Sequence, residues 1–503
     1  MKVCIKIIIA TVLFSSCITT KNKNYTFNQK YSALQIKDDI VLLKKILEAN
    51  HPSLYWYTPK DSIDYYFAET LASIKDSLTE IQAKNKIASI VSKIKCGHTS
   101  VRFSKQFTDL AEKHRYPQFP LSIKTWKDSM VVLGRYNIED SALQRGTIIT
   151  SINGKSSKQM LDSFFQFIST DGDALNFKSQ VLSNNFPAWY RNIFGVDSIY
   201  NITYIDTLHQ EKLITIKSYS PKIDTSKNKV DSTKNLAKKA TPKITEKQKK
   251  LAQLLGYRSL NIDTSINTAY MRLATFSKGN LRKFFRKTFK ELELKQTRNL
   301  IIDLRENGGG NVATSTLLTK YLKDSDYRIG DTVAAISRKF QDKKYIKDWF
   351  GYWFIMNLTA TKMNDGLIHN RFYETHFFSP KTKHHFNGNI YIVQGGYTFS
   401  AATMFASTLK GQKNVTLVGE ETGGGYYGNS AMHLPTIVLP NTKIKVGLPI
   451  YRLVMDKNRP KGNGIIPDIE IQPSSDAIKK GIDLKLMEIR KLIKQKMLQT
   501  NSE

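Results

Sequence analysis

The sequence predicts a mixed α/β (α+β) fold in three parts: a helical N-terminal region, a β-rich middle region and a larger C-terminal α/β region. Three observations predict it. Apolar residues recur at helical spacing before residue 96, β-branched residues alternate between residues 116 and 220, and strand patterns alternate with helix patterns after residue 258. The 503 residues are 41% hydrophobic and 11% aromatic, which suffices for roughly two to four domains with full cores. A wholly disordered chain is therefore excluded.

The N-terminus has the features of an export signal. Two lysines flank the start of an apolar run from Ile7 to Phe14, and this run is too short to span a bilayer as a helix. Cys17 stands where bacterial lipoprotein signals place the lipidated cysteine, so the segment resembles such a signal. We expect a signal at 1–16, lipidation of Cys17, a polar tether at 17–33, and an anchor in outer-membrane lipid within the cell envelope. A plain cleaved signal with an incidental cysteine is the alternative.

Residues 34–115 are predicted to form a helical cap domain. Ile40, Leu43 and Leu47 share one face of a helix, and His51-Pro52 ends it. Up to residue 95 the pattern indicates packing without chemistry of its own.

Residues 116–220 are predicted to form short strands. Within them, β-branched residues alternate up to Asn153-Gly154, a dipeptide typical of a tight hairpin turn, and a helix is expected near Met160. This string resembles the core of a PDZ domain, which binds an extended chain by adding it to a sheet edge.

The net charge is large and unevenly placed. The chain carries 76 Lys and Arg against 43 Asp and Glu, a balance of +33. Residues 221–250 hold ten lysines and three acids with few large apolar side chains, which predicts a flexible linker. Because the charge concentrates in the signal, this linker, an insertion and the C-terminal tail, it indicates surface chemistry near an anionic envelope. Nucleic acid is not an expected partner of an exported protein.

The region 258–475 alternates strands with helices, which implies parallel strand pairing. A basic, aromatic segment at 338–386 interrupts it and forms either an insertion over a groove or a surface subdomain. Residues 476–503 are predicted to form an amphipathic helix. Strands are expected at 268–273, 299–304, 388–393 and 415–418, and helices at 278–294, 312–322 and 401–409.

Three glycine-bearing loops follow three of these strands: the first at 303–311, the second at 395–402 and the third at 419–425. Loops at the carboxyl ends of parallel strands hold ligands in α/β folds, and glycines let backbone N–H groups approach developing negative charge. The spacing fits neither a phosphate-binding P-loop nor a dinucleotide fingerprint. Three residues are expected to contact substrate: Asn307, Gly396 and Gly424.

Ser400 is the candidate nucleophile. It lies at a strand–turn–helix junction beside Ala401, whose N–H could bind an oxyanion. A serine that merely caps the helix is the alternative.

Four motifs in this order resemble the tail-specific (C-terminal processing) family of serine peptidases. They are Asp303-Leu-Arg-x-Asn-Gly-Gly-Gly310, Thr398-x-Ser-Ala-Ala402, Val418-Gly-Glu-x-Thr-Gly-Gly-Gly425 and Gly464-Ile-Ile-Pro-Asp468. The resemblance implies a crotonase-like (ClpP/crotonase-type) spiral catalytic domain with a PDZ-like module. It further implies Ser400 as nucleophile, and an oxyanion hole made by the N–H of Ala401 and of Gly309 or Gly310.

The base is predicted by comparing two branches of this family. One branch uses a lysine just after the third loop's glycines, but here no lysine follows until Lys443. The other branch resembles the tricorn core protease and uses a histidine in a Gly-His-Thr-Ser string, which matches His98. A neutral imidazole accepts a serine proton well near pH 7. His433 is the runner-up.

The acid that orients the histidine in the second branch does not match at its usual place. Lys461 occupies the place where the second branch has its glutamate. Glu420 or Glu421 is the expected substitute.

The function expected from these features is a serine-type endopeptidase that hydrolyses extended protein or peptide substrates with a Ser-His mechanism and without cofactor or metal. Two alternatives stay open. One is a catalytically weak or inactive lipoprotein of the same fold that binds peptide or another ligand, and the other is a charge-driven binder of anionic surfaces.

Overall fold

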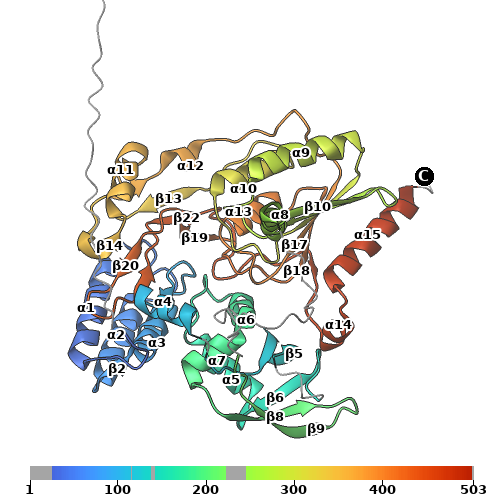
Figure 1. Cartoon of the computed structure of the whole chain (residues 1–503). Coiled ribbons are helices and arrows are strands. Elements are labelled where there is room, and N and C mark those ends of the chain that lie inside the picture. Colours follow the sequence, from blue (N-terminus) through green and yellow to red (C-terminus); the bar gives the residue numbers. More distant parts are fainter. Residues whose placement is uncertain (1–24, 115, 137–141, 222–244, 501–503) are drawn as a thin grey trace, which may run out of the picture.

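The computed structural model describes residues 25–114, 116–136, 142–221 and 245–500 (Figure 1). The predicted export signal, Cys17 and most of the predicted linker lie outside these ranges, so they remain predictions. Within the described ranges, no helix combines the length and the apolar character needed to cross a membrane.

A six-stranded sheet forms the centre of the C-terminal region. Its order is β10-β11-β12-β17-β18-β23; β10 is antiparallel to β11, and every other neighbouring pair is parallel, as the strand–helix alternation predicts. The bounds are β10 Arg258–Asp263, β11 Thr268–Leu273, β12 Asn299–Asp303, β17 Asn389–Gln394, β18 Val415–Gly419 and β23 Ile469–Glu470.

Three helices cover this sheet: α9 (Leu281–Leu294), α10 (Val312–Thr319) and α13 (Ala401–Leu409). Phe285 and Phe289 on α9 meet buried strand residues such as Ile302 in one core. Strand β12 is buried along its whole length, as a central parallel strand should be.

The N-terminal region is helical, as expected. It contains α1 (Ala33–Asn50), α2 (Lys60–Ser73), α3 (Glu80–Ser92) and α4 (Lys105–Lys113), with the short strands β1 (Lys30–Tyr31), β2 (Leu78–Thr79) and β3 (Val101–Arg102). Ser32 and Thr79 make capping boxes that start α1 and α3.

The helical region shares its core with the C-terminal region. Ile40 and Ile87 pack in the same cluster as Val333 and Tyr451. Strand β3 also pairs with β21. This pairing fixes the chain just after His98 against the C-terminal region.

Two smaller sheets surround that shared core. One has the order β15-β16-β13-β22-β19 and the other β14-β20-β21-β3. The predicted insertion contributes several of their elements and packs into the shared core through residues such as Phe340, Ile346 and Met356. Their bounds are β13 Thr332–Ala335, the 3-10 helix η2 Lys343–Tyr345, β14 Ile346–Lys347, α11 Trp349–Thr359, β15 Thr361–Lys362, β16 Ile368–His369, α12 Arg371–Thr375, β19 Gly428–Ala431, β20 Thr436–Val438, β21 Lys445–Gly447 and β22 Tyr451–Val454.

The middle region is a sheet of order β4-β5-β6-β8-β9, with β7 paired to β6. Asn153 and Gly154 both have positive φ and form the predicted turn between β6 and β7. The pattern missed α6 and α7. The bounds are β4 Leu121–Trp126, β5 Ser129–Arg135, β6 Ile148–Ile152, β7 Lys155–Ser156, α5 Ser157–Phe165, α6 Leu175–Asn184, α7 Phe186–Phe194, β8 Ile199–Ile205 and β9 Glu211–Lys217.

Three expected segments differ in detail. The C-terminal tail forms two helices, α14 (Ser475–Lys480) and α15 (Leu484–Thr500), because Gly481 with φ 66° ends the first. The end of the expected tether is tied down, since β1 pairs with β2 and Tyr31 is buried. The end of the expected linker is helical, because α8 (Glu246–Tyr257) begins within it.

Candidate active site

Ser400 lies between β17 and α13, at the point where the chain turns into the helix. Its backbone has φ 54° and ψ −123°, a region that non-glycine residues rarely adopt. Its side chain makes no capping hydrogen bond, so the helix-cap alternative does not describe it. The hydroxyl is therefore available for another partner.

That partner is His98. The distance from His98 Nε2 to Ser400 Oγ is 3.1 Å, although the residues are 302 positions apart. Gly97 allows this approach, because a Cβ at this position would lie 2.6 Å from the ring of Phe399. The structure thus brings the predicted nucleophile and base into hydrogen-bond contact.

Aromatic packing holds the histidine. The His98 and Phe399 rings have centroids 4.7 Å apart, and Phe177 stacks on Phe399, also at 4.7 Å. Burial lowers the pKa of His98 to about 4. The imidazole is therefore neutral at pH 7, the state in which it can accept a proton.

Asp171 is a residue of the site that sequence reasoning missed. It is 2% exposed, and its carboxylate accepts hydrogen bonds from Gly97 N–H at 2.8 Å and from Gly425 N–H at 3.4 Å. Burial raises the pKa of Asp171 to about 7, with the two backbone donors acting against that rise. One carboxylate thus joins the histidine loop to the third glycine loop.

Among the described residues, one group has the ligand types and proximity to hold a metal ion. Cys96 Sγ, a ring nitrogen of His98 and a carboxylate oxygen of Asp171 all lie within 4.8 Å of one another. Both carboxylate oxygens of Asp171 already accept backbone hydrogen bonds, and burial raises the pKa of Cys96 to about 12. The cluster therefore places near the histidine a carboxyl group that ionises as pH rises through about 7.

The oxyanion donors differ in part from expectation. The N–H of Gly309 donates to Asn307 Oδ1 at 2.9 Å and is thereby occupied. Among the described residues, the N–H groups of Ala401 and Gly310 have no backbone acceptor. A Cβ on Gly309 would lie 2.7 Å from Ser400 Cβ, so only glycine allows the first loop to pass this close.

The three expected substrate contacts have structural roles. Asn307 is fully buried and holds Gly309. A Cβ on Gly396 would lie 2.2 Å from the carbonyl oxygen of Asn176, and one on Gly424 would lie 2.3 Å from Thr403 Oγ1. These glycines allow backbone segments to pack closely around Ser400.

Neither Glu420 nor Glu421 takes the expected place beside the histidine. The carboxylate of Glu420 pairs with Lys485 Nζ at 2.5 Å, and both side chains are nearly buried. The carboxylate of Glu421 accepts from Gly464 N–H at 2.7 Å. Both glutamates hold backbone or tail segments in place.

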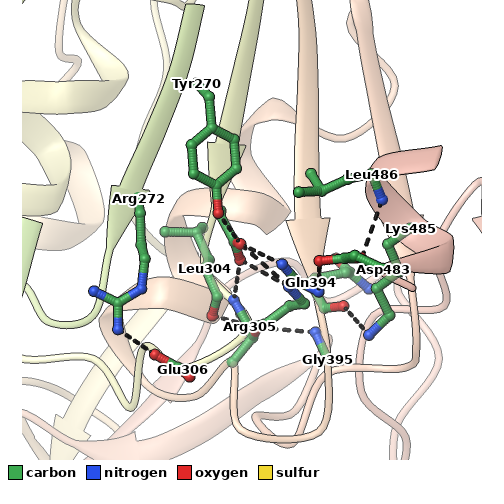
Figure 2. A network of polar contacts seen from close by, with 12 residues as sticks. Tyr270, Arg272, Leu304, Arg305, Glu306, Gln394, Gly395, Asp483, Lys485 and Leu486 are labelled. Atoms are coloured by element: carbon green, nitrogen blue, oxygen red, sulfur yellow. Dashed lines mark hydrogen bonds and ion pairs between the residues drawn. The ribbon is translucent and has the colours of Figure 1, made fainter. Parts of the chain in front are cut away.

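Lys485 and Asp483 also take part in a polar network that joins the start of the C-terminal helix to the glycine loops (Figure 2). Arg305 lies at its centre and pairs with Asp303 at 2.6 Å and with Asp483 at 2.7 Å. The network therefore anchors the start of α15 beside the first and second loops.

Lys461 and His433 contact groups other than His98 and Ser400. Lys461 Nζ donates to the carbonyl oxygen of Trp56 at 2.6 Å and lies over two aromatic rings of the helical region. His433 packs between Tyr352 and Tyr451, with ring centroids 5.3 and 5.4 Å away. His433 is thus enclosed by aromatic rings beside the insertion, and its position does not support the runner-up assignment.

One family profile matches part of the chain. Residues 267–471 match the profile of Peptidase family S41. This segment holds the six-stranded sheet apart from β10, the three glycine loops and Ser400. The segment therefore has the S41 serine-peptidase fold.

Solved structures extend the similarity over almost the whole chain. The crystal structure of mature CPAF has a TM-score of 0.63 and 12% identity, covering 92% of this chain and 97% of that one. Mature CPAF complexed with lactacystin gives 0.62 and 12%, covering 94% and 99%. The crystal structure of the tricorn protease gives 0.38 and 12%, covering 92% of this chain and 37% of that one, and supports no argument. No curated protein matched the chain.

Proposed function

We propose that this protein is a serine-type endopeptidase in which Ser400 is the nucleophile and His98 the base. The observation that carries the proposal is the 3.1 Å contact between His98 Nε2 and Ser400 Oγ, made by a serine on strained backbone. The S41 match of the surrounding segment supports the same class of reaction.

The reaction would follow the general course of serine peptidases. Ser400 Oγ attacks the peptide carbonyl while its proton passes to His98 Nε2. The N–H groups of Ala401 and Gly310 stabilise the oxyanion. His98 then gives the proton to the leaving amine, and a water molecule releases the acyl group by the reverse sequence.

Asp171 would act as the positioning residue in place of Glu420 or Glu421. It holds the backbone next to His98 through Gly97 N–H and ties it to the third loop through Gly425 N–H. When ionised, it would also stabilise the imidazolium that forms during the reaction.

The substrate would be an extended polypeptide. The sheet of the middle region leaves β9 at an edge, and Glu211, Lys212 and Leu213 on this strand are exposed. Edge strands accept extended chains through backbone hydrogen bonds, which is how a PDZ-like module would hold a substrate. We further propose that the protein is an exported lipoprotein of the cell envelope, anchored through Cys17.

Replacement of the nucleophile tests the proposal. Ser400→Ala should abolish hydrolysis of unfolded, fluorophore-labelled casein, because the attacking atom is lost. Ser407→Ala, in the same helix, is the control and should retain activity. Hydrolysis by purified Ser400→Ala at the wild-type rate would refute the proposal.

A second candidate is a binding protein of the same fold with little or no catalysis. Two observations favour it: His98 Nδ1 is buried without a hydrogen-bond partner, and Lys461 stands where the resembled branch has a glutamate. Wild-type protein that binds casein without cleaving it would support this candidate.

A further inference from the structure

Helix α11 is apolar on both of its faces. Trp349, Tyr352 and Met356 pack against the core that the helical region shares with the insertion. On the other side, Phe350 and Leu358 are 60% and 70% exposed. Phe354 between them is 51% exposed, and the spacing of four residues aligns all three in one stripe.

Such a stripe needs a partner, because a helix that is apolar all round is normally buried. Trp353 and Ile355 flank it and are also exposed. No other element of the described ranges covers these side chains.

A basic rim borders the stripe, since Lys339, Lys343 and Lys344 line one hollow together with Phe350 and Trp353. Five lysines and two aspartates lie between residues 339 and 362. Asp342 is paired with Lys45 at 3.1 Å, which reduces the acidic contribution further. Lys343 Nζ lies 4.5 Å above the ring of Trp349, so positive charge and aromatic surface are adjacent.

This combination fits an anionic lipid surface better than a second copy of the chain. Tryptophan, tyrosine and lysine gather where proteins meet the headgroup region of a bilayer. In a symmetric pair, the lysines of two such rims would face each other and repel. Lysine is also depleted from protein–protein interfaces.

We propose that the α11 face, defined as residues 339–347 together with Phe350, Trp353, Phe354 and Leu358, docks on a bilayer that contains anionic phospholipid. The apolar stripe would enter the boundary between headgroups and acyl chains, and the lysines would contact lipid phosphates. This proposal does not depend on the proposed peptidase activity.

The position of α11 supports this orientation. In Figure 1 it lies at the outer edge of the molecule, on the opposite side from β9. Docking through α11 would therefore leave the middle region, which is proposed to receive substrate, facing away from the bilayer.

The test uses the full chain with Cys17→Ser, so that no acyl chain contributes to binding. Cosedimentation is measured with vesicles of phosphatidylcholine alone and with roughly one-third phosphatidylglycerol. We expect binding to the anionic vesicles that weakens as salt is added. Phe350→Ser/Phe354→Ser and Lys343→Glu/Lys344→Glu should each weaken it by about ten-fold.

Leu208→Ser/Leu213→Ser is the matched control, because these leucines are even more exposed than Phe350 and Phe354 but lie on the β8–β9 hairpin. It should bind as the parent chain does. Urea unfolding midpoints show whether each variant is folded. Equal binding to both kinds of vesicle, or unchanged binding by a folded stripe variant, would overturn the proposal. The proposal would also be overturned if the parent chain sedimented as a dimer in the absence of vesicles and the stripe variant sedimented as a monomer.

Discussion

At the scale of single residues, the contact between Ser400 and His98 depends on groups that hold the histidine. Gly97 leaves room for Phe399, and Asp171 accepts the N–H of Gly97. The ring nitrogen that does not face Ser400 has no hydrogen-bond partner. Orientation of the imidazole therefore comes from its backbone and from ring packing.

Asp171→Asn tests this positioning role. Because burial raises the pKa of Asp171 to about 7, its carboxylate forms as pH rises through 7, and kcat of the wild type should rise between pH 6 and 8. The variant should have kcat about 10- to 100-fold lower, with KM little changed and without that rise. Casein hydrolysis across this pH range measures both effects.

Asp173→Asn is the control for that experiment, because Asp173 is two positions away and pairs on the surface with Lys95. It should retain the wild-type profile. If Asp171→Asn kept the rise between pH 6 and 8, Asp171 would not be the group responsible.

The sequence was enough to select Ser400 and His98 as interacting site residues, because both lie in motifs that resemble those of a known family. It did not reveal Asp171, which lies 74 positions from Gly97 in a segment without a motif. Glu420 was predicted from its place beside the third loop, but the sequence could not show that its carboxylate forms an ion pair with Lys485.

At the scale of elements, the strongly patterned segments were predicted best. Strand β11 and helix α13 begin and end where expected, since each is bounded by polar or glycine-rich turns. Helix α7 was missed, although Asn185 as N-cap and Pro187 in its first turn signal a helix start. The strand patterns around it outweighed that signal.

The C-terminal helix is predicted to stabilise the glycine loops through its buried ion pair. Lys485→Met should lower the free energy of unfolding by about 3 kcal/mol, because it leaves Glu420 buried without its cation. Urea unfolding measures this change. Adding Glu420→Leu to this variant should recover much of the loss.

Lys480→Met is the comparison for that cycle, because Lys480 pairs with Asp476 on the exposed surface of α14. Its effect should stay below about 0.5 kcal/mol. Equal losses from Lys480→Met and Lys485→Met would show that burial of the Glu420–Lys485 pair does not matter.

At the scale of the whole molecule, buried histidines should couple stability to pH. Burial lowers the pKa of His51 to about 3 and that of His98 to about 4. A lowered folded-state pKa gives stability that is present above the unfolded value, near 6.5, and is lost as pH falls toward the folded value. Both histidines should therefore favour unfolding between pH 6.5 and 4.

His51→Asn measures one of these contributions. At pH 7 the variant should be less stable than the wild type, because His51 bonds to Thr99 and Ser53 in the buried region. The difference should narrow as pH falls to 4, since the variant has no imidazole for the unfolded state to protonate. Urea unfolding at pH 7, 5.5 and 4 measures it; a constant difference would contradict this assignment.

At this scale the structure also shows where part of the net charge of +33 lies. Composition alone did not decide whether this charge serves binding to nucleic acid, binding to lipid or solvation of the surface. The structure places Lys339, Lys343 and Lys344 beside the exposed aromatic side chains Phe350 and Trp353 of α11. Sequence could not predict this arrangement, because α11 has the composition of a core helix and only its packing shows which face is left uncovered.

The central claim is that His98 activates Ser400 as a nucleophile. A fluorophosphonate probe followed by peptide mass spectrometry tests it most directly, because the probe modifies only an activated serine. The account predicts a single adduct on Ser400, absent from Ser400→Ala and strongly reduced in a folded His98→Ala variant. Labelling of another serine, or undiminished labelling of Ser400 in His98→Ala, would contradict it.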